Sequence, residues 1–447
     1  MTFKSTAFRL ISCVMASLAS AVCVQAVEAR ELFRYNPFDP DKVTNADRTT
    51  RAYEENRIAY PLSEVETMED YGEIADSARK ALSIVPFDAF AMNILSEALF
   101  NLDRPREAMD MAFLSMETSD EDYEAYNLLS SGSTLDPQYL LSKTLPAIEK
   151  IRACANPTSI QANNLPTFMF LSAEAYLENE EIPEAYRMLK ELMKTEQGHP
   201  DVANLMATVM LASGNAPKAE KLLKPIIDDF EFAYKVYDNY ALSLRDSGKG
   251  DKALEFYRKL REDFDDLYDV DYASMLADLG KDDEALQIYS RYIKKHDDYL
   301  REQRSTGVPD PDPQWDNNYV SALLRSGIIY MKRGDKAAAT EKFNAAMETC
   351  LAYGLPTGYE ATICAWLGDK AGMEKWMKEY TSNDSFYKAA LYYAVGDREK
   401  ALEYLAEAFD KHTVCPDRII YAPDFPGIAE LPEYKALVKN YRPLKLD

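Results

Sequence analysis

Histidine is scarce in this sequence, and it never occurs at a spacing that would bind a metal. The 447 residues include three histidines, His199, His296 and His412, and no HExxH or paired Cys/His motif. Zinc sites and histidine-based catalytic triads need such ligands close together. We therefore expect a non-catalytic protein with no cofactor and no metal. A site built from dispersed carboxylates is the alternative, because acidic residues are abundant.

Cysteine is also scarce. Two of the six cysteines, Cys13 and Cys23, lie in an apolar N-terminal segment, which leaves Cys154, Cys350, Cys364 and Cys415. So low a density in a long chain is not a disulfide framework. Cys350 and Cys364 fall in consecutive expected helices, so a disulfide between them would be within reach. Buried free thiols that fill the core are the alternative that we prefer.

Long hydrophobic runs are missing except at the N-terminus. There the apolar stretch "LISCVMASLASAVCV" follows basic residues and precedes small-residue cleavage sites that end at Ala26 or Ala29. This pattern predicts a signal peptide over residues 1–29 and an exported protein that is periplasmic, secreted or associated with the cell envelope. The run is short for a membrane-spanning helix of about 20 residues. A lipid anchor at Cys13 is disfavoured because Arg9 leaves almost no apolar region before it.

Basic residues are too few to balance the acidic ones. The chain has 51 Lys and Arg against 75 Asp and Glu, which gives a net charge of −24. Such a chain repels nucleic acids and anionic lipid surfaces. We therefore expect no nucleic-acid partner and no transmembrane segment in the mature chain.

What the sequence does contain is a repeat. Segments such as "LRDSGKGDKALEFY" and "LADLGKDDEALQIY" share one pattern, in which a helical stretch ends at Gly or Asn and a second begins at Asp, Glu or Pro. Several anchor positions lie 34 residues apart, and one step is 32. The anchors are Ala108, Ala185, Ala219, Ala253, Ala285, Ala339, Met373 and Ala401. This recurring sequence pattern predicts repeated antiparallel helix pairs.

The most complete unit lies around "YMKRGDKAAATEKFNAAM". It places small and bulky residues at Gly327, Tyr330, Gly334, Ala339, Phe343 and Ala346. With this pattern the chain resembles the tetratricopeptide repeat family over about residues 55–440. The resemblance implies an all-α fold, an α-solenoid of stacked antiparallel helix pairs in a right-handed superhelix. The first helix of each pair would line the concave groove.

The repeat register also divides the chain. Residues 123–165 lack a clean Gly-Asp turn, and a Pro-Asp stretch before Trp315 cannot continue a helix. We predict a signal peptide at 1–29, an N-terminal extension at 30–54, an N-terminal stack at 55–296 with an irregular section at 123–165, a Pro/Asp loop joint at 297–316, a C-terminal stack at 317–410 and a capping segment at 411–447.

Candidate partner-binding residues follow from the groove positions of the first helices. We predict Phe90, Asn93, Glu97, Asn101, Phe170, Glu174, Glu178, Asp201, Asn204 and Asp238. These positions lack the Lys and Arg that would capture a carboxylate. An extended basic or polar segment of a protein or peptide partner suits them better, plausibly in an envelope-associated assembly. Solvated helix faces without a partner are the alternative.

Two further clusters have structural and functional interpretations. The expected C-terminal stack holds the aromatic residues Tyr359, Trp366, Trp376, Phe386, Tyr387, Tyr392 and Tyr393. Such stripes are usually core, but exposed members would favour a carbohydrate- or cell-wall-binding module as the second candidate function. The acidic run from Asp263 to Asp271 lacks the glycine of a calcium loop, so a solvated repeat junction is the preferred interpretation.

Overall fold

The computed structural model describes residues 68–118, 123–195, 199–229, 236–305, 317–353, 357–380 and 384–446. The predicted signal peptide, the N-terminal extension and the start of the first repeat lie outside these ranges. The described residues form α-helices and short 3-10 turns, with no strand among them, which confirms the all-α prediction. No described helix is both long and apolar enough to cross a membrane.

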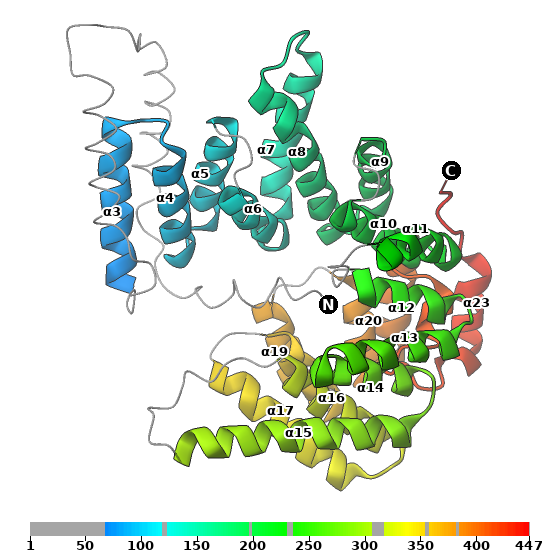
Figure 1. Cartoon of the computed structure of the whole chain (residues 1–447). Coiled ribbons are helices and arrows are strands. Elements are labelled where there is room, and N and C mark those ends of the chain that lie inside the picture. The colour runs from blue at the N-terminus through cyan, green and yellow to red at the C-terminus, as the bar shows by residue number, and fades with distance from the viewer. Residues whose placement is uncertain are drawn as a thin grey trace, which may run out of the picture. The chain divides into compact units, whose positions relative to one another are not determined.

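The chain divides into two compact units, residues 1–179 and residues 180–447, and Figure 1 labels their helices. The helices of unit 1 are α3 (Met68–Ile84), α4 (Ala89–Asn101), α5 (Pro105–Thr118), α6 (Tyr123–Leu135), α7 (Pro137–Ala153) and α8 (Ser159–Glu178). The predicted irregular section is helical through α6, α7 and the start of α8. Its irregularity lies in its prolines, since Pro146 and Pro166 stand inside α7 and α8.

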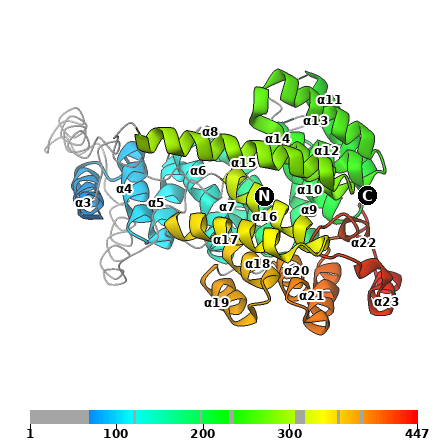
Figure 2. The same ribbon diagram turned by 90° about the horizontal axis from the view of Figure 1, so that it is seen from below.

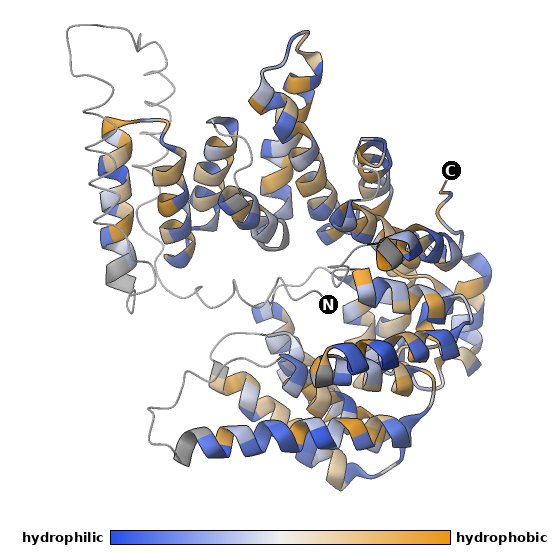
Figure 3. Ribbon diagram, viewed as in Figure 1, coloured by the Kyte–Doolittle hydropathy of each residue, from blue (hydrophilic) through white to orange (hydrophobic). Residues whose placement is uncertain are grey.

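Unit 2 continues with helix pairs and ends in a different segment. Its repeat helices are α9 (Ile182–Leu192), α10 (Pro200–Ala212), α11 (Ala216–Asp229), α12 (Tyr237–Asp246), α13 (Gly250–Asp263), α14 (Asp269–Asp278), α15 (Asp282–Ser305), α16 (Asn317–Lys332), α17 (Lys336–Tyr353), α18 (Tyr359–Trp366), α19 (Lys370–Tyr380), α20 (Ser385–Ala394) and α21 (Arg398–Asp410). The turn η4 (Asp265–Tyr268) precedes α14, and α22 (Pro416–Ile419), η5 (Ile428–Glu430) and α23 (Pro432–Asn440) close the unit. Figure 3 shows that the long helix α15 is mostly hydrophilic.

The turn inside most helix pairs has one residue in the left-handed region of the backbone, and the α6–α7 turn is an exception, since Asp136 has a φ of −147°. In unit 2 this is usually glycine, as at Gly248, whose φ is 74°. The next amide, Lys249 N, donates to Leu244 O at 2.8 Å, which closes a Schellman-type C-cap. Glycine adopts this conformation without the steric cost of a Cβ atom. Asp103 and Glu180 have positive φ values of 56° and 60° in the corresponding turns. Each carries a Cβ atom, so its backbone is sterically strained there.

In the repeat formed by α16 and α17, small residues lie where the two helices approach closely. A Cβ atom at Gly327 would lie 2.5 Å from Phe343 Cε1. Ala339, Phe343 and Ala346 are fully buried, whereas Tyr330 is half-buried. The expectation that bulky and small residues interlock between α16 and α17 is therefore confirmed.

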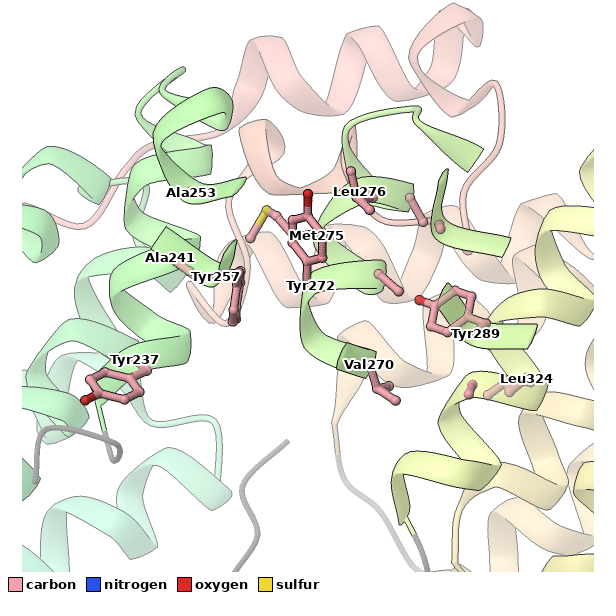
Figure 4. Packing of buried hydrophobic residues seen from close by; sticks show 14 of the residues in the cluster. Tyr237, Ala241, Ala253, Tyr257, Val270, Tyr272, Met275, Leu276, Tyr289 and Leu324 are labelled. Carbon is pink, nitrogen blue, oxygen red and sulfur yellow. The ribbon is translucent and has the colours of Figure 1, made fainter. Parts of the chain in front are cut away.

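One hydrophobic cluster runs through unit 2 from α10 to α18. Figure 4 shows part of it, with Tyr257, Tyr272 and Tyr289 set between helices. The cluster includes residues of both α15 and α16, so the core does not break at the predicted joint 297–316. Residues 297–305 belong to α15, and the compact units divide between Asn179 and Glu180 instead.

The C-terminal segment has its own cluster with the last helix pair. Ile419, Phe425, Ile428 and Tyr434 pack with α20 and α21 residues such as Phe409. Ile420 and Val438 also fit the apolar pattern in the sequence, but they are exposed. The segment therefore packs on the last helix pair through only some of its apolar side chains.

Candidate functional site

The first helices of unit 1, α4, α6 and α8, contact one another through their side chains. Asn93 Nδ2 donates to Glu124 Oε2 at 3.3 Å, which joins α4 to α6. Ser130 Oγ donates to Glu174 Oε2 at 2.9 Å, which joins α6 to α8. We call the row formed by Phe90, Asn93, Glu97, Glu124, Glu174 and Glu178 the inner face of unit 1.

Most predicted residues of this face are accessible. Phe90 is 45% exposed, Glu97 and Glu178 are exposed, and Asn93 and Glu174 are half-buried. Sequence reasoning missed Glu124, an exposed residue of α6, because the irregular section gave no repeat register.

Two predicted residues are not available to a partner, and the prediction was wrong for them. Asn101 is 3% exposed, and its Nδ2 turns back to donate to Glu97 O of its own helix at 2.7 Å. Phe170 is 8% exposed and packs against the ring of Tyr126, with ring centroids 6.2 Å apart. Both positions face a neighbouring turn or helix, which helical spacing alone does not reveal.

The helices that form the inner face carry acidic side chains and no basic ones. The helices α4, α6 and α8 contain Glu97, Glu124, Glu174 and Glu178 and no Lys or Arg. Loss of surrounding water and the nearby Glu124 carboxylate raise the pKa of Glu97. The Glu97 carboxyl therefore loses its proton at a higher pH than an isolated glutamate, as expected where like charges gather.

The outer helices of unit 1 carry charges of both signs and pair them. Arg106 Nε lies 2.7 Å from Asp136 Oδ2, and Lys143 Nζ lies 2.5 Å from Asp110 Oδ1. Tyr139 OH also donates to Asp110, at 2.9 Å. The one-sided charge is thus a property of the inner helices and not of unit 1 as a whole.

In unit 2 the predicted groove residues lie on α10 and α12. Asn239 Nδ2 donates to Asn204 Oδ1 at 2.7 Å and to Thr208 Oγ1 at 3.0 Å, so the amide of Asn204 is engaged within the groove. Asp238 is exposed and accepts a hydrogen bond from Tyr257 OH at 2.9 Å. Asp201 is half-buried at the start of α10.

The chain's own C-terminal segment contacts the ends of α10 and α12. We call residues 415–426 the terminal strap. Its first residue, Cys415, has Sγ 3.6 Å from Leu211 O at the end of α10. Figure 2 shows α22, which lies in the strap, between the α10 end and the α20–α21 end of the unit.

Charged and aromatic contacts hold the terminal strap against α12. Arg418 Nε lies 3.3 Å from Asp246 Oδ2, and the Arg245 guanidinium lies 5.0 Å from the centroid of the Tyr421 ring. Arg245 Nη1 also donates to Asp278 at the end of α14, at 2.5 Å. The last turn of α12 therefore binds the chain's own C-terminal segment.

The strap ends against α18 and α20. Trp366 Nε1 donates to Asp424 Oδ1 at 3.4 Å, and Tyr393 OH donates to Pro426 O at 2.9 Å. The rings of Phe386 and Phe425 stack with centroids 5.7 Å apart. Burial raises the pKa of Asp424, although the nearby Arg325 opposes this.

The alternative sites find little support in the described residues. Tyr359, Trp366, Trp376, Phe386, Tyr387, Tyr392 and Tyr393 are all buried or half-buried. They therefore offer no exposed aromatic platform for a sugar. In the acidic run, the buried Asp269 binds Arg261 Nε at 2.5 Å and Arg291 Nη2 at 2.7 Å, and no group of three metal-binding side chains occurs in the described ranges.

The cysteines of unit 2 are free thiols. Cys350 and Cys364 are both buried, and burial raises the pKa of Cys350 to about 12. They thus follow the preferred interpretation as core-filling side chains, not the disulfide. Cys154, in unit 1, is exposed.

Comparison with known proteins places one part of the chain in a family. Residues 169–234, from α8 through α11, match the tetratricopeptide repeat family model. No curated protein matches the chain in sequence. A solved structure described as the crystal structure of the APC/C hetero-tetramer Cut9-Hcn1 is 12% identical over 94% of both chains, but its TM-score of 0.26 is too low to compare the arrangement of helices. With its helix pairs and the left-handed turn residues Glu180 and Gly214, the part of the chain that matches the family model is a tetratricopeptide-repeat region.

Proposed function

We propose that this protein is a non-catalytic scaffold that binds a basic segment of a protein partner along the inner face of unit 1. The observation that carries the proposal is the charge of that face. Three adjoining helices present Glu97, Glu124, Glu174 and Glu178 without one basic residue among them. Lysine or arginine side chains of a partner would be electrostatically complementary to these carboxylates.

The inner face also offers contacts that do not depend on charge. Phe90 provides an exposed apolar surface at the start of α4, and Asn93 lies between it and Glu97 on the same helix. An asparagine amide can bond to the backbone of an extended peptide. A cation placed between Glu97 and Glu124 would relieve the repulsion that raises the pKa of Glu97. Binding should therefore weaken as salt increases.

Unit 1 is favoured over the end of unit 2 that the terminal strap contacts. There Asp246 and Asp278 already bind Arg418, Arg245 and Arg325, and a partner would have to displace these cations. Displacing a buried, paired arginine costs more than binding to an accessible carboxylate.

The cellular setting is a separate part of the proposal. The apolar segment and small-residue cleavage sites of residues 1–29 support export, and with it a partner in an envelope-associated assembly. Fractionation of the producing cells, with N-terminal sequencing of the mature protein, tests this. A mature chain that starts before residue 26 and remains in the cytoplasm would remove this part of the proposal and leave the binding face untouched.

The binding face is tested by removing two of its charges. The variant Glu97→Gln with Glu124→Gln should bind a dye-labelled lysine–serine peptide about three- to tenfold more weakly than the unchanged protein, measured by fluorescence anisotropy. This corresponds to roughly 0.3–0.7 kcal/mol for each of the two partly exposed ion pairs. The matched control is Glu73→Gln with Glu149→Gln, which makes the same change in net charge at exposed positions on α3 and α7. If both double variants bind the peptide equally, the inner face is not the site.

A further inference from the structure

A second exposed apolar surface lies on unit 2, where α13 runs into η4. Phe264 is 45% exposed and Leu267 is 58% exposed. The ring of Tyr268 makes edge contacts with Phe264, at 5.8 Å between centroids, and with Tyr237, at 5.9 Å. These side chains thus form a continuous row that leads from the exposed Phe264 inward to α12.

Carboxylates surround this row. Asp263 and Asp238 are exposed, and Asp271 lies half-buried on α14. Asp238 and Asp271 both raise the pKa of Tyr268, after burial and Tyr237, so their charges lie near its hydroxyl. The row and the carboxylates together form one surface, which we call the aromatic–acid patch: Asp238, Asp263, Phe264, Leu267, Tyr268 and Asp271.

Two arginines of this part of unit 2 are already engaged with another acid. Arg261 and Arg291 both bond to the buried Asp269. Asp238, Asp263 and Asp271 make no ion pair with any residue in the described ranges. Asp238 receives a neutral donor instead, the hydroxyl of Tyr257 at 2.9 Å.

We propose that the aromatic–acid patch is a second docking surface, which binds a partner segment carrying lysine or arginine next to an apolar side chain. The apolar side chain would lie on Phe264 and Leu267, and the cation would lie against Asp238 and Asp271. Removing such an apolar side chain from water on Phe264 and Leu267 favours binding, against the entropic costs of association. The surface is separate from the inner face of unit 1, and the inference does not depend on that site.

A second copy of this chain does not fit as the occupant. In a symmetric dimer the same patch would face itself and bring like charges together. The chain as a whole carries a net charge of −24, which adds to the repulsion. Charge complementarity therefore favours a basic partner.

The protonation of Asp271 supplies an independent readout. Burial and the neighbouring Asp238 raise the pKa of Asp271 to about 7. The charged and titratable groups that act on it or respond to it are Asp238 of α12, Tyr257 of α13, Tyr268 of η4, Tyr289 of α15 and Arg325 of α16. A bound cation favours the ionised carboxylate, so binding should be tighter at pH 8 than at pH 6.

The test uses the full chain with Glu97→Gln and Glu124→Gln, so that binding at unit 1 is already weakened. A dye-labelled peptide of lysine and leucine is the probe. Adding Phe264→Ser and Leu267→Ser should weaken its binding about tenfold. The matched control, Leu351→Ser with Leu367→Ser, removes two other exposed leucines of unit 2 and should leave binding unchanged.

A charge variant completes the experiment. Asp238→Asn should weaken binding of the same peptide at pH 8 and reduce the difference between pH 8 and pH 6. Circular dichroism checks that each variant keeps its helices. If the Phe264/Leu267 variant binds like the Leu351/Leu367 control, the docking surface is refuted, while the result for Glu97 and Glu124 still stands. Failure of the unit 1 test leaves the patch standing in the same way.

Discussion

Replacing Glu180 by glycine should destabilise unit 2, although the change removes a strained backbone conformation. Glu180 lies in the turn before α9 with a φ of 60°, where most other repeats of unit 2 have glycine. Its carboxylate accepts hydrogen bonds from Ser385 N at 2.5 Å, Ser385 Oγ at 2.7 Å and Lys411 Nζ at 2.6 Å. Residue 180 is thereby tied to the start of α20, 205 residues later in the chain.

The magnitude follows from these three contacts. Glu180 is 6% exposed and Ser385 is buried, so each hydrogen bond between them is worth about 1.5–3 kcal/mol. Lys411 is more exposed and keeps Glu407 at 2.6 Å, so its loss adds little. Glycine recovers roughly 1 kcal/mol of backbone strain. We expect a net loss of about 2–5 kcal/mol from the free energy of unfolding.

The tryptophans make this measurement specific to one unit. All three, Trp315, Trp366 and Trp376, lie in unit 2, so intrinsic fluorescence follows its unfolding alone. With a urea m-value of about 2–3 kcal/mol/M, the transition midpoint of Glu180→Gly should fall by roughly 1 M.

Asp103→Gly is the matched control for this experiment. It makes the same backbone change in the α4–α5 turn of unit 1, where the residue's φ is 56°. The tryptophan transition should stay where it is in that variant, while the helix signal in circular dichroism is unchanged or shifts to higher urea. A tryptophan midpoint for Glu180→Gly at or above that of the unchanged protein would refute the reasoning.

Three further substitutions test other parts of unit 2. Ala339→Leu should overpack the fully buried α16–α17 contact and lower stability by about 1–3 kcal/mol in a thermal melt. Arg418→Ala should lower the tryptophan-monitored urea midpoint, because it leaves the buried Asp246 without one of its cations. Asp271→Asn should stabilise the protein by about 2 kcal/mol at pH 8 and by much less at pH 4, compared by urea unfolding. With a folded pKa of about 7, the native carboxyl binds a proton that the unfolded chain has lost, so the unchanged protein loses stability as pH rises from about 4 to 7.

The repeat itself was predictable because its physical requirements are local. A turn that needs a positive φ selects glycine, and Gly248, Gly280 and Gly334 mark three such turns in the sequence. Close approach of two helices selects small residues, as at Gly327 and Ala339. Both signals recur at a fixed period, so the fold could be read from one chain.

The contacts that close unit 2 were not predictable from any local signal. Glu180 and Ser385, or Asp246 and Arg418, are more than 170 residues apart in sequence, and their meeting depends on small rotations summed over many helix pairs. The pattern of the capping segment indicated only that it would cover α21. Asn101 shows a finer limit, because helical spacing gives the side of a helix but not whether a side chain turns back onto its own backbone.

Because the terminal strap ties several helix pairs of unit 2 together, we expect unit 2 to be more rigid than unit 1. In an open repeat stack each helix pair contacts only its neighbours, and the groove can widen or twist at small cost. In unit 2 the strap contacts α10, α12, α18 and α20, so moving any of these pairs breaks contacts with the strap as well as with the adjacent pair. Unit 2 should therefore unfold in one cooperative transition and keep its groove at a fixed width. Unit 1, whose described helices pack against near neighbours, retains the freedom to adjust to a partner, and the acidic side chains of its inner face are those that a basic partner would meet.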